Sequence, residues 1–496
     1  MYGNIVGTFA WRVNIPVKRV MLVYPPGALF QRGEDRCQSN VESSTATSMR
    51  ACNDLGYISS QLKKDNHEIF LKDYPSENLT IDDFLNDFRT FLPDVLFIST
   101  TNATIFDDLE IIKQIKKQKR DTVVILKGAV FFDAPIDLIN NLVFEDADYL
   151  VGGESEFIVR ELVNYHFYNP ENINNVPAIF YKKDNIWHKT FFDSFDENVD
   201  SLPFPDRSLM NNSLYVRPDT GEMQATISIG RGCPSSCIYC LSPKINGKKV
   251  RQRTPKNVLD EMIDCYQNFG IKNFFFKSDT FTINEKWVIE LCDLILNSEL
   301  AGKINWVANS RTNTVSEAMF KKMKKAGCWL VAFGFESGSQ DSLNKMKKGT
   351  TVEQSYEAVK IAKKAGLKIF GFYMIGFPWE TESHLEQTKK LMFKLDTDFV
   401  EVHIATPFYG TEFYEMLKND FGLSNDVLGK DYFKNVIVEN SNLSSDFILK
   451  YRSSLLLQYH LRPRYILNKL IEALLNPKIL FNYSKYGFRL IRNLSK

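Results

Sequence analysis

The half of the chain that follows residue 224 alternates short apolar runs with helical stretches. Six runs have the length and the branched or aromatic composition of buried strands, and each is followed by a helical pattern or a turn. They lie at residues 225–229, 272–276, 304–308, 329–333, 368–374 and 399–404. The helical patterns lie at residues 255–268, 285–297, 316–326, 352–365 and 380–393. Because eight such units close a TIM barrel, six predict an open, partial (β/α)6 TIM-like barrel whose chemistry lies at the carboxyl ends of its strands.

Three cysteines follow the first of these strands within eight residues. Residues 229–240 read I-G-R-G-C-P-S-S-C-I-Y-C and hold Cys233, Cys237 and Cys240. A loop with this spacing can wrap three thiolates around one inorganic centre. An electron-transfer cluster or a structural zinc normally takes four protein ligands, whereas three leave one coordination position free for a substrate or cosubstrate. The spacing therefore indicates a reactive site.

Two other interpretations of the three thiols stay open. One is a structural zinc completed by a distant Cys or His, and the other is a disulfide pair with a spare thiol. None of the remaining cysteines stands in a second CxxC or CxxH pair; they are Cys37, Cys52, Cys265, Cys292 and Cys328. Cys265 and Cys292 fall on the apolar faces of predicted helices, which is typical of core residues.

The pattern C-x3-C-x-aromatic-C, with Tyr239 as the aromatic residue, resembles the cluster loop of the radical S-adenosylmethionine (radical SAM) superfamily. The resemblance implies a 4Fe-4S cluster held by Cys233, Cys237 and Cys240, with the fourth iron chelated by the amino and carboxylate groups of S-adenosylmethionine. One electron from the cluster would cleave a carbon-sulfur bond to give methionine and a 5'-deoxyadenosyl radical. The protein's task would be to position and shield that radical.

Short polar or glycine-rich motifs follow the other strands and suggest contacts to S-adenosylmethionine. The sequence G-F-E-S-G-S after the fourth strand resembles the superfamily's ribose and methionine motif. The sequence G-F-P-W-E-T after the fifth strand resembles the superfamily's adenine segment. The sequence T-P-F-Y-G-T after the sixth strand matches a further turn of the superfamily. Each motif alone is weak, since an isolated acid could cap a helix and a Gly-Phe-Pro run could be a plain turn. Their coincidence with consecutive strand ends carries the prediction. The predicted cofactor-binding residues are Tyr239, Asp279, Arg311, Glu336, Ser337, Gly376, Phe377 and Pro378. No catalytic acid or base is assigned.

The first part of the chain predicts an open parallel sheet. Strand-like runs at residues 19–24, 68–72, 95–99, 123–126 and 149–151 alternate with helical patterns, notably at residues 46–64 and 107–118. Ligands of such sheets lie beyond the carboxyl ends of the strands, so the candidate loops are residues 25–33, 99–104, 127–131 and 152–156.

This strand order, ending in Y-L-V-G-G-E-S-E, is similar to the cobalamin-binding domain that precedes the radical domain in one branch of the superfamily. The resemblance therefore implies cobalamin as a third cofactor and a class B methyltransferase-like enzyme. The chain departs from the family in having no D-x-H-x-x-G signature for a histidine ligand of cobalt. His67 is a near miss that precedes the second strand, and we interpret it as a turn residue.

Four regions are predicted in all. Residues 1–166 form a Rossmann-like, cobalamin-binding-like domain, and residues 167–222 form a linker with a small hairpin that turns at residues 183–185. Residues 223–430 form the radical SAM core barrel. Residues 431–496 form a helical, basic and amphipathic C-terminal region.

Composition limits the possible partners and locations. The 496 residues carry a net charge of +1, which gives no electrostatic case for nucleic acid. Residues 1–11 have no secretory signal pattern, and no run approaches about 18 apolar residues. Thiols kept for a reducible cluster fit a reducing cytoplasm. The tail from residue 451 to 496 has nine Lys or Arg against one acid, which predicts either a helical cap with a solvated basic face or a peripheral membrane contact.

The leading hypothesis is a cobalamin-dependent radical SAM enzyme that methylates an unactivated carbon of a small-molecule or lipid-like substrate. The resemblance also implies a reducing electron donor of the flavodoxin or ferredoxin type. A cyclase or rearrangement enzyme of the same architecture is the alternative, and a noncatalytic iron-sulfur sensor or scaffold is the alternative of another class. His403 on the sixth strand either points inward to the substrate or packs as an ordinary buried histidine.

Overall fold

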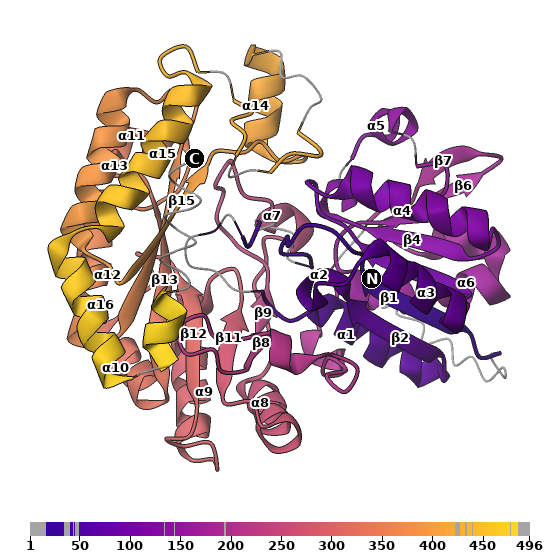
Figure 1. Cartoon of the computed structure of the whole chain (residues 1–496), viewed down its shortest axis with the longest axis horizontal. Helices are drawn as coiled ribbons and strands as arrows, with labels where there is room; N and C mark the ends of the chain where they lie inside the picture. The colour runs from indigo at the N-terminus through magenta and orange to yellow at the C-terminus, as the bar shows by residue number, and fades with distance from the viewer. Residues whose placement is uncertain are drawn as a thin grey trace, which may run out of the picture.

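The computed structural model describes residues 16–33, 40–42, 44, 49–132, 134–142, 144–192, 195–421, 427–431, 434–438, 440–476 and 478–484. Residues 1–11, Cys37 and the last twelve residues of the basic tail lie outside the described residues. Two α/β bodies lie side by side (Figure 1): the N-terminal one, indigo to magenta, and the barrel, magenta to orange.

The N-terminal body is built on a seven-stranded sheet with the order β2-β1-β3-β4-β5-β6-β7. The first five strands are parallel, as predicted, and the last two form an antiparallel hairpin that continues the sheet from β5. The strands are β1 (Arg19–Tyr24), β2 (Glu68–Asp73), β3 (Val95–Ser99), β4 (Val123–Lys127), β5 (Tyr149–Val151), β6 (Ile179–Lys183) and β7 (Ile186–Lys189).

Helices cover both faces of this sheet because its central strands are apolar on both sides. Val20 and Leu22 of β1 pack with α1 and α6 in one core, whereas Met21 and Val23 pack with α3, α4 and α5 in the other. The helices are α1 (Asn53–Leu62), α2 (Tyr74–Glu77), α3 (Ile81–Phe91), α4 (Ile105–Gln118), α5 (Ile136–Asn141) and α6 (Ser155–Tyr168).

Two local expectations differ from the structure in detail. The helix expected from residue 46 begins at Asn53, and the described residues 49–52 before it are not helical. At the helix start, the Asn53 side chain donates to the carbonyl of Thr226 in the barrel at 2.6 Å. The hairpin expected between the domains does turn at Asp184 and Asn185, both with positive φ. It belongs to the first sheet, however, so the boundary between the predicted regions stays a prediction.

The barrel sheet has six parallel strands in the order β8-β11-β12-β13-β14-β15, and the predicted open (β/α)6 architecture is confirmed. The strands are β8 (Gln224–Ser228), β11 (Asn273–Lys277), β12 (Asn305–Ser310), β13 (Cys328–Glu336), β14 (Lys368–Ile375) and β15 (Phe399–Ile404). A short antiparallel pair, β9 (Gly230–Arg231) with β10 (Arg251–Gln252), brackets the cysteine loop.

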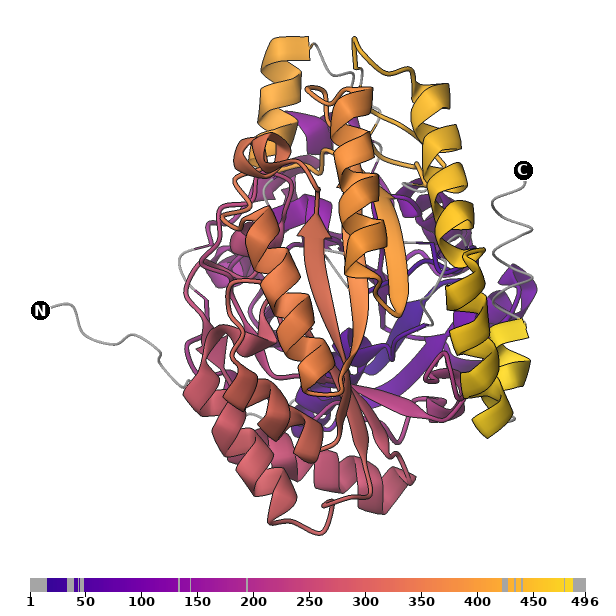
Figure 2. The ribbon, with the colours of Figure 1, turned by 90° about the vertical axis from the view of Figure 1, so that its left-hand side faces the viewer.

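Capped helices cover the outer face of the barrel sheet, as the orange helices in Figure 2 show. Thr254, Ser316 and Thr351 each accept a backbone N–H at a helix start, which fixes where α8, α10 and α12 begin. The helices are α7 (Ser242–Ile245), α8 (Pro255–Phe269), α9 (Glu285–Leu296), α10 (Glu317–Lys325), α11 (Gln340–Lys345), α12 (Val352–Lys364), α13 (Glu382–Leu395) and α14 (Glu412–Phe421).

The C-terminal region is helical, as predicted, and lies along the barrel (yellow in Figure 2). Helix α15 (Ser445–His460) buries Ile448, Leu455 and Leu456 against the barrel core, and α16 (Pro463–Leu475) follows it. Within the described part of the chain, no helix combines the length and the apolar character needed to cross a bilayer.

The long loop after β1 crosses from the first body to the barrel. The Ser44 hydroxyl donates to the Glu401 carboxylate on β15 at 2.7 Å, and the Asn40 amide donates to Asp431 at 3.1 Å. Arg452 of α15 pairs with the same Glu401 at 3.2 Å. The N-terminal body is therefore fastened to the last strand of the barrel as well as to the first.

Candidate functional site

Backbone hydrogen bonds hold the cysteine loop at the carboxyl end of β8. Gly232 has φ +92, and a Cβ there would meet the carbonyl of Lys249 at 1.9 Å, so only glycine fits. The N–H of Cys233 donates to Gly247, and the N–H of Ile238 donates to Met346. The loop is thus fixed to two separate segments of the barrel.

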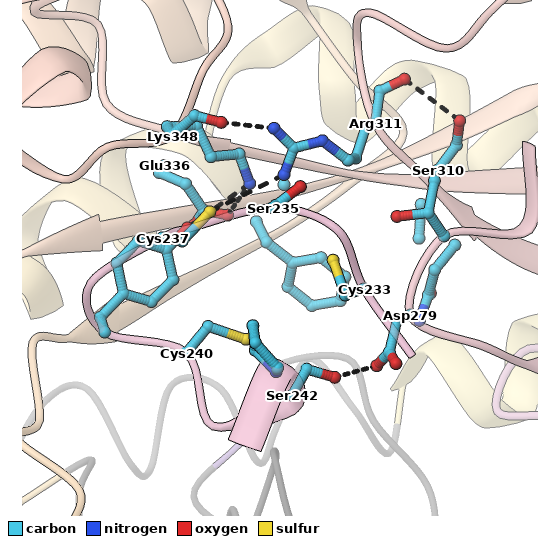
Figure 3. A pocket seen from close by; sticks show the side chains of 17 residues that line it. Cys233, Ser235, Cys237, Cys240, Ser242, Asp279, Ser310, Arg311, Glu336 and Lys348 are labelled. Carbon is cyan, nitrogen blue, oxygen red and sulfur yellow. Dashed lines mark hydrogen bonds and ion pairs between the residues drawn. The ribbon is translucent and has the colours of Figure 1, made fainter. Parts of the chain in front are cut away.

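All three cysteines line one cavity of about 170 Å³ (Figure 3). Cys233 and Cys237 are buried, Cys240 is partly exposed, and none of the described cysteines forms a disulfide. Arg311 Nη1 lies 3.8 Å from the sulfur of Cys237. The disulfide interpretation therefore does not hold for these residues.

The three thiols do not converge on a single point. Among the described residues, no group of three His, Cys, Asp or Glu is placed to hold one metal ion. A 4Fe-4S cluster takes each thiolate on a different iron, so its ligands surround a volume and need not meet at one ion. A buried cavity lined by three cysteines from one loop fits such a cluster better than a structural zinc.

Opposite charges meet in the same cavity, beyond the cysteines. Lys348 Nζ lies 2.6 Å from Glu336 Oε1, and both side chains are at most 10% exposed. Arg311 Nη2 donates to the carbonyl of Lys348, which ties the third strand end to this pair. A ligand that carries both an ammonium and a carboxylate, as S-adenosylmethionine does, matches such a set of groups.

The backbone at Glu336 is strained. Glu336 is the last residue of β13, follows a register irregularity in the pairing with β14, and has φ +62. A non-glycine residue held in this region costs free energy and is common where a side chain must be aimed at a ligand. Burial, and then the charge of Glu336, raise the pKa of Tyr239 well above its usual value, so Tyr239 stays neutral.

Asp279 follows β11 and lies at the edge of this cavity. The Ser242 hydroxyl donates to its carboxylate, and the Asn246 amide lies 3.4 Å from it. Both partners come from the segment just after the cysteine loop. Asp279 is therefore positioned by the loop that carries the cluster ligands.

The turn after β14 does not line the cavity. Gly376 has φ +93, and the N–H groups of Gly376 and Phe377 donate to Glu380 Oε2 at 2.7 and 3.1 Å. The Ser342 hydroxyl donates to the other oxygen of Glu380 at 3.1 Å. Burial raises the pKa of Glu380 to about 7. The Phe377 ring packs beside Tyr239, with centroids 6.1 Å apart.

The predicted cofactor contacts thus separate into two groups. Tyr239, Asp279, Arg311 and Glu336 line the cavity together with the three cysteines. Ser337 is fully buried and hydrogen-bonded to Thr388 at 3.1 Å, away from the cavity. The remaining predicted contacts, which do not line it either, are Gly376, Phe377 and Pro378. The role of every one of these residues stays a prediction.

Sequence reasoning missed Lys348 and Ser242. Both line the cavity, but Lys348 follows helix α11 and Ser242 begins the short helix α7. A search of strand ends does not find residues that follow helices. The only local signal for Ser242 is its distance of two residues from Cys240.

A second cavity of about 50 Å³ lies between the two sheets, where their carboxyl ends face each other. Lys127 at the end of β4 and Glu156 at the start of α6 line it from the first body, and Lys277 and Asp279 line it from the barrel. The predicted ligand loops 25–33, 127–131 and 152–156 each contribute a residue. Asp279 lines both cavities, so the two are neighbours.

Two buried polar atoms of the second cavity have no hydrogen-bond partner. They are Oδ1 of Asn53 and Oγ of Ser278, in side chains that are 6% exposed. Buried polar groups are nearly always paired, so these atoms indicate room for a polar ligand.

Ion pairs join the two bodies beside this cavity. Arg251 reaches Glu154 with both terminal nitrogens, one of them 3.1 Å from Oε2, and Arg231 contacts Glu154 and Glu156. The two acids lie in the loop after β5 and at the start of α6, and the two arginines lie in the β9–β10 pair around the cysteine loop. The distance between the two cavities is therefore fixed by buried charges.

None of the six histidines lines either cavity, and all six lie in described parts of the chain. His67 precedes β2 at the amino edge of its sheet, where its Nδ1 accepts from the N–H of Lys18 at 3.2 Å. It lies at the end of the sheet opposite the cavity, as expected of a turn residue. His403 lies on β15 beside Phe372, and burial lowers its pKa, so it is neutral near pH 7.

Comparisons with known proteins agree with this geometry. Residues 227–392 match the radical SAM superfamily. A protein of Pyrococcus horikoshii, named an uncharacterized methyltransferase, is 30% identical over 423 residues, covering 84% of this chain and 89% of that protein. The anaerobic magnesium-protoporphyrin IX monomethyl ester cyclase of Cereibacter sphaeroides is 25% identical over 375 residues, covering 74% of this chain and 60% of that protein.

A solved structure shares the arrangement of both bodies. TsrM of Kitasatospora setae is a radical S-adenosylmethionine methyltransferase solved with cobalamin and a [4Fe-4S] cluster bound. It superposes with a TM-score of 0.64 at 17% identity, covering 81% of this chain and 75% of that one. At this identity the likeness concerns the fold, in which a cobalamin-binding-like domain precedes a radical SAM barrel. The extent of the match to the Pyrococcus relative, together with the superfamily match, shows that this chain is an enzyme and belongs to the radical SAM superfamily.

Proposed function

We propose that this enzyme is a cobalamin-dependent radical SAM methyltransferase that adds a methyl group to an unactivated carbon. In this proposal Cys233, Cys237 and Cys240 hold a 4Fe-4S cluster in the first cavity, and cobalamin occupies the space between the two bodies. The cluster would supply the electron that cleaves S-adenosylmethionine, and the corrinoid would supply the methyl group taken from a second S-adenosylmethionine.

One observation carries the proposal: the cysteine-lined cavity and the interdomain cavity share Asp279. A 5'-deoxyadenosyl radical reacts with whatever lies next to it, so a methyl donor for the same carbon must lie within a short distance. The fastening of Glu154 to Arg251 keeps that distance constant. Two adjacent cavities at facing strand ends meet this requirement.

The residues of the first cavity suit the binding of S-adenosylmethionine. Glu336 and Asp279 are acceptors for its ammonium or ribose hydroxyls, and Arg311 and Lys348 are donors for its carboxylate. The Glu380-capped turn at Gly376 places Phe377 behind Tyr239, and Tyr239 lines the cavity on the side of the proposed adenine.

The interdomain cavity suits a corrinoid in its chemistry. The unpaired Oδ1 of Asn53 and Oγ of Ser278 are acceptors for the amide groups at the rim of a corrin. No histidine among the described lining residues is available to ligate cobalt, so the proposal includes cobalamin held without a protein imidazole.

The test uses anaerobically reconstituted protein. We expect about four irons per chain, bound cobalt, and 5'-deoxyadenosine on reduction with S-adenosylmethionine. Cys233→Ala should abolish iron binding and 5'-deoxyadenosine but retain corrinoid, whereas Cys292→Ala, a change at a buried core thiol, should retain all three. Iron and 5'-deoxyadenosine without any corrinoid uptake would reject methylation through cobalamin.

The similarity to the Cereibacter cyclase supports a second candidate, a radical SAM cyclase or rearrangement enzyme of the same architecture. The two candidates differ in the fate of the second S-adenosylmethionine. A methyltransferase forms S-adenosylhomocysteine in step with product, and a cyclase forms none. Membership of an enzyme superfamily speaks against the noncatalytic sensor.

A further inference from the structure

Helix α16 lies on the barrel with its polar side inward. Glu472 pairs with Lys368 at the start of β14 at 2.8 Å and with Lys469 at 3.3 Å. The Tyr465 hydroxyl donates to the carbonyl of Asp398, just before β15, at 3.0 Å. Because these hydrogen bonds and ion pairs hold the polar side chains of α16 against the barrel, they fix which side of the helix faces the barrel.

The opposite side of α16 is apolar and faces outward. Its spacing of i, i+1, i+4, i+5 and i+8 forms one stripe along the helix. The stripe, which we call the outer face of α16, consists of Ile466, Leu467, Leu470, Ile471 and Leu474. Leu474 is 81% exposed, and Phe481 beyond the helix is 73% exposed. Eight of the fourteen exposed large hydrophobic residues in the described chain lie between residues 461 and 481, so the exposure is concentrated in one place.

The sequence that carries the outer face is rich in positive charge. Arg464 lies beside the stripe and forms no ion pair within the part of the chain that the structure describes. Residues 461–496 contain eight Lys or Arg and a single acid, Glu472, which is already paired inside. A second copy of this chain would bring two such positive regions together, whereas an anionic surface would complement them.

We propose that the outer face of α16 is a contact surface for an anionic phospholipid membrane. An interfacial helix of this type inserts aliphatic side chains at the level of the headgroups while basic residues pair with anionic lipids. The contacts of α16 lie at the amino ends of β14 and β15, whereas the cysteine loop follows the carboxyl end of β8. The contact therefore anchors the enzyme by the side of the barrel away from its catalytic cavity.

The test is flotation of the full-length protein with vesicles of phosphatidylcholine, with and without phosphatidylglycerol. We expect the wild type to float with the anionic vesicles and to remain with the protein fraction when the vesicles are neutral. Replacing Leu467, Leu470 and Leu474 by Gln should lower the vesicle-bound fraction at least about ten-fold. Because these side chains are exposed, melting temperature and reconstituted iron content should stay unchanged.

The matched control replaces three exposed aliphatic residues elsewhere, Val17, Ile136 and Ile186, by Gln. This variant should float like the wild type. The proposal is overturned if the wild type does not bind anionic vesicles, or if the Leu variant binds them as the wild type does. A lipid-free dimer that the Leu variant converts to a monomer would assign the outer face to a second copy instead.

Discussion

Glu154 and Arg251 form a two-point ion pair across the boundary between the two bodies, with both side chains at most 5% exposed. Glu154 belongs to the loop after β5, and Arg251 belongs to the short strand that closes the cysteine loop. The pair therefore joins the edge of the proposed corrinoid site to the edge of the cluster site in one contact.

Glu154→Gln should lower the free energy of unfolding by about 3 kcal/mol, because it leaves the buried Arg251 guanidinium without its counter-charge. Urea denaturation measures the change. Glu197→Gln is the matched control, since Glu197 pairs with Lys249 on the surface and should change the value by less than about 1 kcal/mol. Equal effects of the two substitutions would contradict a special role for the buried pair.

Lys348→Met should weaken the binding of S-adenosylmethionine at least about ten-fold, since it removes a charge-assisted donor worth about 1.5 to 3 kcal/mol. Iron content should not change, because Lys348 is not a cluster ligand. The neighbouring Lys347 is 54% exposed and pairs with Glu412 outside the cavity, so Lys347→Met should bind the cosubstrate normally. Equilibrium binding to the reconstituted protein measures both, and a wild-type affinity in Lys348→Met would remove this residue from the site.

Glu380 should make the stability of the fold dependent on pH. Its pKa rises from an ordinary 4.5 to about 7 in the folded protein, so the folded state holds a proton that the unfolded state has lost. Stability from this group is therefore present at low pH and is lost as the pH rises through this interval, by up to about 3 kcal/mol at pH 8.

Thermal unfolding at pH 5.5 and pH 8 tests this dependence. Glu380→Gln should lose less stability between the two values than the wild type, because its amide does not titrate. Glu382→Gln changes an exposed acid at the start of α13, two residues away, and should behave as the wild type. Identical pH profiles for wild type and Glu380→Gln would show that another group titrates.

Cobalamin bound to this protein should carry no protein nitrogen on cobalt, because no histidine lines either cavity in the described parts of the chain. The measurement is the electron paramagnetic resonance spectrum of the cob(II)alamin state. Uniform labelling of the protein with the heavy nitrogen isotope should leave the nitrogen splitting unchanged. A splitting that changes with the label, and that disappears in a histidine variant such as His67→Ala, would identify a ligand that this structure does not place at the cavity.

Most of the fold could be predicted because buried parallel strands appear in the sequence as continuous apolar runs. The strand at residues 95–99 matches β3, and the cysteine spacing indicated the loop that lines the first cavity. The prediction ended β13 at residue 333, whereas the strand continues to Glu336 and holds it in a strained conformation. Hydrophobic patterns carry no signal for such strain.

Contacts between distant segments explain most of what the sequence did not reveal. The side chain of Asn53, the first residue of α1, donates to the carbonyl of Thr226, 173 residues away. Lys348 follows a helix and pairs with Glu336. A search for functional residues at the carboxyl ends of strands does not include its position. The orientation of α16, with its charges inward, depends on Lys368 and Asp398 in the barrel, so the amphipathic pattern alone did not indicate which side faces outward.

The contact between Ser44 and Glu401 also imposes an order of events during synthesis. The two residues are 357 positions apart, so the ribosome makes most of the protein before the loop after β1 can meet its partner on β15. The strands of the N-terminal sheet can pair early, but this loop can form its contact only after the last strand of the barrel has been synthesised. A truncated chain that ends before β15 would therefore lack Glu401, the residue to which Ser44 of this loop is bonded.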